Sequence, residues 1–114
     1  MVLNKGEKIH IITRRLFEGD LRRHFIGEVV EISDTVLRVE GYVFVYDSGA
    51  SAYLRRNERR IRIVSIASAE SIINVIPQDV QLEDLEYKFN REERLIVTDN
   101  KEFSLDINEF GARM

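Results

Sequence analysis

The chain has no cysteine and no tryptophan, and only one proline among its 114 residues. Without cysteine there can be no disulfide framework, thiolate nucleophile or cysteine-based zinc site, so a reducing compartment is expected. No apolar run is long enough to cross a bilayer, and residues 1–8 lack the apolar core of a signal peptide. These absences predict a soluble, cytoplasmic protein without a membrane partner.

Composition and length favour one folded unit. Hydrophobic residues make up 44% and charged residues 32%, which suffices to bury one core and argues against intrinsic disorder. Residues 1–76 contain 12 Lys and Arg against 10 Asp and Glu (+2), whereas residues 77–114 contain 5 against 10 (−5), which together give the net charge of −3. This split could let an acidic tail shield a mildly basic body or let one copy attract another, although a chance distribution of solvated charge would look the same.

Apolar residues recur at every second position, a period that predicts strands rather than helices. Turn residues divide the first part of the chain into five predicted strands: Lys8 toward Phe17, Phe25 to Ile32, Thr35 to Tyr46, Tyr53 to Ile66 or Ala67, and Ser71 to Ile76. Gly27 and Gly41 allow these strands to bend. Residues 53–60 are too polar for a core, so we expect them to project from the body.

The chain becomes acidic after Pro77. Leu85, Tyr87 and Phe89 alternate with polar residues, and a second alternating run ends at Ile107, which predicts a meander of about three strands. Residues 79–89 could instead form a short helix. We expect residues 78–114 to be an acidic extension packed on or beside the body, as part of a single structural unit.

The order of these strands resembles the Sm-like barrel, a form of the SH3-like small β-barrel. The segments that resemble it are residues 26–34, which end in Asp34, and the closing strands at 61–66 and 71–77. The resemblance implies a five-stranded barrel over residues 1–77 and rings formed through edge-strand pairing. The family's RNA pocket uses an asparagine shortly after the aspartate and an arginine-glycine pair before the last strand. Here Asp34 is followed by Thr35 and Val36, and the last connection ends in Glu70, so that pocket is not implied.

An arginine-rich hairpin is the strongest local signal. Arginine offers a planar fork of donors for phosphate, and a neighbouring tyrosine could stack on a base. The candidate nucleic-acid or polyanion contacts are Tyr53, Arg55, Arg56, Arg59, Arg60 and Arg62, with Arg22 and Arg23 from the first turn. Against this interpretation, the pI near 5.4 is low for a nucleic-acid-binding domain. The arginines could instead protect a sheet edge or pair with the acidic C-terminal part.

Catalytic and metal motifs are not found in the sequence. His10 and His24 are the only histidines, whereas a metal site normally needs three or four ligands, so we predict no metal and no cofactor. His10 lies between isoleucines, which favours a hydrogen-bonded, partly buried ring. No serine has a nucleophile-elbow context, no glycine-rich loop is formed, and the acidic pairs lie in polar stretches. The sequence therefore predicts no enzyme.

Two functions follow from these patterns. The first is a non-enzymatic β-barrel module that forms homo-oligomers and contacts other proteins through edge strands, expected at Phe25–Ile32 and Ser71–Ile76. The alternative is an RNA- or DNA-binding protein that uses the arginine-rich hairpin.

Overall fold

The computed structural model describes residues 2–13, 23–50, 52–67 and 71–107. These residues form nine strands and one short 3₁₀ helix, with no α-helix among them, which confirms the prediction of a mainly β protein. The turn expected between the first two predicted strands, the extension of the first strand to Phe17, and Arg22 lie outside the described residues.

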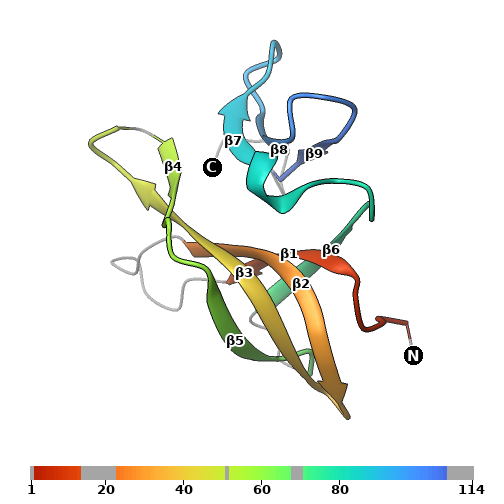
Figure 1. The fold of residues 1–114 in the computed structure, drawn as a ribbon. Helices are drawn as coiled ribbons and strands as arrows, with labels where there is room; N and C mark the ends of the chain where they lie inside the picture. Colours follow the sequence, from red (N-terminus) through yellow and green to blue (C-terminus); the bar gives the residue numbers. More distant parts are fainter. Residues whose placement is uncertain (1, 14–22, 51, 68–70, 108–114) are drawn as a thin grey trace.

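One large antiparallel sheet forms the main body (Figure 1). Its strands are β1 (Lys8–Thr13), β2 (Arg23–Ser33), β3 (Val36–Asp47), β4 (Ala52–Arg55), β5 (Arg60–Ser65) and β6 (Ser71–Ile76). They pair in the order β4-β3-β2-β1-β6, and β5 also pairs with β3. The predicted fourth strand is thus two strands, because β4 pairs with residues 44–47 of β3 and β5 pairs with residues 36–41.

The prediction that Phe25–Ile32 is an edge strand is wrong. β2 pairs with β1 along one side and with β3 along the other, so its backbone groups are used within the sheet. The outermost strands are β6 at one end and β4 and β5 at the other. Within the described ranges β5 and β6 do not pair with each other, so no closed barrel is formed there.

Two glycines let the long strands approach closely. Gly27 in β2 lies directly opposite Gly41 in β3. A Cβ atom added to Gly41 would overlap the carbonyl oxygen of Ile26, and one added to Gly27 would lie 2.6 Å from that of Glu40. Since real Cβ atoms do not approach so closely, any larger residue at either position would push the strands apart.

The sheet has a buried apolar cluster on each face. One cluster includes Ile9, Phe25 and Val39, and Val64 of β5 and Ile73 of β6 both pack against it. Because the two outer strands touch the same cluster, the sheet curls around it. The other face carries Ile26 and Phe44, which belong to a second cluster.

Residues 80–107 cover that second face. The 3₁₀ helix η1 (Leu82–Asp84) precedes a three-stranded meander of β7 (Glu86–Phe89), β8 (Leu95–Thr98) and β9 (Ser104–Asp106), as Figure 1 shows. The predicted meander is therefore confirmed, and the open choice at residues 79–89 resolves into both a short helical turn and a strand. Leu85 and Val97 of this part share one buried cluster with Ile26 and Phe44 of the main sheet.

Candidate functional site

Three polar side chains meet between the main sheet and the meander. His10 of β1 and His24 of β2 point to the same face, two positions apart in the register of the two strands, because His10 lies opposite Ile26. Tyr87 of β7 reaches them from the opposite side. The Tyr87 hydroxyl lies 2.9 Å from His10 Nε2 and 2.7 Å from His24 Nδ1, and the two ring nitrogens are 3.2 Å apart. A fourth residue, Asn74 of β6, places its side-chain nitrogen 3.2 Å from His10 Nδ1.

These contacts define one arrangement of protons. The Asn74 amide nitrogen is a donor, so His10 Nδ1 accepts and His10 Nε2 carries the proton. His10 Nε2 then donates to the Tyr87 oxygen, and the Tyr87 hydroxyl donates to His24 Nδ1. The two shorter contacts are therefore hydrogen bonds, each with its own hydrogen. The contact between the two histidine nitrogens is not a separate hydrogen bond.

The cluster is almost completely removed from water. His10 is fully buried, and His24 and Tyr87 are buried as well. Burial lowers the pKa of His10 to about 4. It also lowers the pKa of His24 to about 3, with a further contribution from His10. Burial, with a smaller contribution from Tyr53, raises the pKa of Tyr87 well above its ordinary value. Both imidazoles and the phenol are therefore neutral at neutral pH.

The expectation of a hydrogen-bonded His10 ring is confirmed, with more complete burial than predicted. Sequence reasoning missed Tyr87 as a partner. The alternation of Leu85, Tyr87 and Phe89 is the only signal in the sequence that concerns Tyr87. It predicts that these residues form a strand, but not which strand lies on the other side of the core. His10 and Tyr87 are 77 positions apart, so only the tertiary fold brings them together.

Tyr53 does not lie on a surface where a base could stack. Its side chain is only 6% exposed, and its ring stacks on Tyr87 with centroids 4.8 Å apart. It also contacts the His24 ring. The prediction that Tyr53 projects with the polar hairpin is wrong because β4 alternates: Tyr53 faces the core, whereas Leu54 is exposed.

The candidate arginines divide into two groups. Arg55 and Arg59 lie over the ring of Tyr42, with guanidinium carbons 4.8 and 5.5 Å from its centroid. Arg62 lies over Phe25 on the other face of the sheet, opposite Val39. Burial lowers the pKa of Arg62, and the charges of the nearby Arg60 and Arg23 lower it further. Arg60 and Arg23 therefore lie near Arg62, whereas Arg56 belongs to neither group and is exposed in the connection between β4 and β5.

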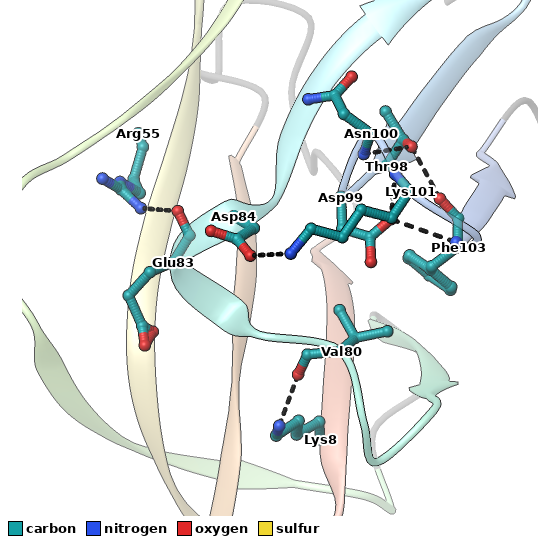
Figure 2. A network of polar contacts seen from close by, with 10 residues as sticks. All are labelled: Lys8, Arg55, Val80, Glu83, Asp84, Thr98, Asp99, Asn100, Lys101 and Phe103. Atoms are coloured by element: carbon teal, nitrogen blue, oxygen red, sulfur yellow. Dashed lines mark hydrogen bonds and ion pairs between the residues drawn. The ribbon is translucent and has the colours of Figure 1, made fainter.

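The first of these groups contacts the acidic C-terminal part. Arg55 donates to the backbone carbonyl of Glu83 at 3.0 Å, and Figure 2 shows this bond beside η1. Arg59 pairs with Glu40 at 3.0 Å and with the Glu83 carboxylate at 4.0 Å. These contacts agree with the predicted salt bridges to the acidic part, here within one chain.

Two lysines contact the segment that joins the main sheet to the meander (Figure 2). Lys8 of β1 donates to the backbone carbonyl of Val80, as Figure 2 shows. It also donates to the backbone carbonyl of Gln78. Lys101, from the loop before β9, donates to the Asp84 carboxylate at 3.1 Å. The segment that joins the main sheet to the meander is therefore held by cations from both.

The outer strands of the main sheet carry exposed aliphatic side chains. Ile61 and Ile63 of β5 are 59% and 60% exposed, and Ile72 and Val75 of β6 are 44% and 58% exposed. These exposed aliphatic residues of β5 and β6 indicate surfaces suited to a contact with another protein chain.

Comparison with protein-family models, with curated proteins and with solved structures gives no match. Among the residues described, no group of three His, Cys, Asp or Glu side chains gathers at one point, and no helix has the length and apolar character needed to span a membrane.

Proposed function

We propose that this protein is a non-enzymatic β module that assembles with copies of itself, by pairing β6 of one copy with β5 of the next. The proposal includes the Sm-like form of the main sheet expected from the sequence. Its support comes from the two open ends of that sheet.

The character of β6 carries the proposal. Its sequence, SIINVI, contains no charge, no proline and no glycine, and four of its six residues are aliphatic. An edge strand of this kind is a template for pairing, which natural proteins normally cover or protect with charge. Along the described chain β6 pairs only with β1, so its other side offers backbone donors and acceptors.

A second copy of the chain supplies a matching edge. β5 is also six residues long, and in the described residues it pairs only with β3. Like β6, it carries exposed aliphatic side chains, which in β5 are Ile61 and Ile63. Since Arg60 and Arg62 alternate with them, two β5 strands would bring like charges together, which favours pairing of β5 with β6. A contact between different surfaces repeats from copy to copy and closes into a ring when the rotation permits.

Nucleic-acid binding is the weaker candidate. Arg23, Arg60 and Arg62 form a basic group, which favours it. The burial of Tyr53 and the pairing of Arg59 with two acids remove two of its expected contacts. A mobility-shift assay at low salt with RNA and with DNA tests this alternative. A shift that Arg60→Ser and Arg62→Ser abolish together would support it.

Complementary edge variants test the self-assembly proposal. Ile63→Lys places a charge in β5, and Val75→Lys places one in β6, so each variant should block one edge and keep the other. By sedimentation velocity, the unmodified protein should exceed 13.3 kDa several-fold, and each variant alone should sediment as a monomer of that mass. Mixed in equal amounts, the two variants should form a dimer, because one retains β6 and the other retains β5.

Phe89→Lys is the matched control. Phe89 is about as exposed, at 51%, but lies in the meander, so its lysine variant should assemble like the unmodified protein. Assembly by either edge variant alone, or a mixture that stays monomeric, would contradict the pairing of β5 with β6.

A further inference from the structure

His10, His24 and Tyr87 place three metal-binding atoms around one point. Imidazole nitrogen is a ligand for zinc and related divalent ions, and the oxygen of an ionised phenol can complete such a site. The three atoms lie 2.7, 2.9 and 3.2 Å apart. Ligand atoms about 2.0 Å from a tetrahedral zinc ion are separated by about 3.3 Å, so a small outward movement of each side chain would make room for the ion.

We propose that His10, His24 and Tyr87 form a site for one divalent transition-metal ion of the zinc class. Three protein ligands leave one position of a tetrahedral ion for water. Asn74 is a positioning residue that acts through the second nitrogen of His10, as the outer partners of metal-bound histidines do.

The proton balance of binding is defined by the hydrogen bonds already described. The phenol proton of Tyr87 leaves to solvent when its oxygen binds the ion. The proton on His10 Nε2 moves to Nδ1, where the Asn74 amide, rotated by half a turn, accepts it through its oxygen. His24 Nδ1 carries no proton in this arrangement and needs none removed. Each ion bound therefore releases one proton.

A cleft in the surface also reaches one of the three proposed ligands. A cleft of about 330 Å³ runs between β4 and the meander, and Tyr87 is part of its lining. Tyr46 and Phe89 line the same cleft, which therefore reaches the Tyr87 side of the cluster.

The test uses the full chain without a histidine tag, because His10 and His24 are its only histidines. After treatment with a chelator, the protein is titrated with Zn²⁺ and, as a spectroscopic probe, with Co²⁺. We expect one ion per chain after dialysis, release of one proton per ion, and a tyrosinate absorbance difference. The Co²⁺ form should show the intense visible bands of a tetrahedral site.

Tyr87→Phe removes the oxygen and keeps the ring in the core. It should bind Zn²⁺ at least about tenfold more weakly and lose the tyrosinate signal. Tyr46→Phe removes a hydroxyl in the same cleft but outside the cluster, and should bind like the unmodified protein. Absence of retained metal in the unmodified protein, or equal Zn²⁺ affinity in Tyr87→Phe, would overturn the proposal. The unmodified protein decides the outcome even if a variant fails to fold.

Discussion

Mild acid should destabilise this protein through His10 and His24. Both are neutral and buried in the fold, with pKa values of about 4 and about 3, against an ordinary value of 6.5. Because the folded-state values are lowered, the unfolded chain takes up protons first as the pH falls. The stability linked to these histidines is therefore complete above pH 6.5 and is lost progressively below it.

The size of the effect follows from proton linkage. A histidine that is protonated only in the unfolded chain changes the free energy of unfolding by about 1.4 kcal/mol per pH unit. Between about pH 6 and about pH 5 the unfolded chain carries most of two such protons, so the free energy of unfolding should fall by about 2 kcal/mol. Carboxyl groups remain largely ionised in this interval, so the histidines dominate it.

Urea unfolding followed by circular dichroism, in the presence of a chelator, measures this change. His24→Gln keeps a polar side chain but removes one titrating group, so its loss between the same two pH values should be about 1 kcal/mol. A stability that stays constant from pH 7 to pH 5 in the unmodified protein would refute the reasoning. An equal loss in both proteins would show that other groups are responsible.

Two further predictions concern the packing. Gly41→Ala should lower the free energy of unfolding by at least about 3 kcal/mol or prevent folding, because the added Cβ would meet the Ile26 carbonyl oxygen. Gly49→Ala is its control. The atom nearest to the Cβ added there is 3.3 Å away, so thermal stability should change little. Leu85→Ala should lower the free energy of unfolding by about 2–5 kcal/mol. The variant should still unfold in one cooperative transition, because the main sheet and the meander share a core. Phe89→Ala, at an exposed position, is its control, and a separate early transition of the meander would contradict the shared core.

Local sequence information was sufficient for most strands. The two-residue period identified the strands of the main sheet and the meander, and the glycines marked the bend where β2 and β3 touch. The break between β4 and β5 was missed because both are extended and differ only in which part of β3 they pair with. Tyr53 was misplaced because its polar neighbours hid the alternation within a four-residue strand.

The outer strands and the buried cluster depend on contacts between distant residues. Phe25–Ile32 reads equally well as an edge or a central strand, and only its pairing with both neighbours decides the matter. The apolar alternation around the two histidines did not indicate a contact with a tyrosine far along the chain. Periodicity determines the direction of a side chain, whereas strand order determines what it meets.

Amide hydrogen exchange on β5 and β6, followed as protein concentration rises, tests the central claim most directly. In an isolated copy, the amides on the open side of each strand face solvent and should exchange fast. Pairing of β6 with β5 of another copy predicts that exchange in both strands slows with concentration, while exchange in β8 stays constant. Exchange in β5 and β6 that does not depend on concentration would contradict the account.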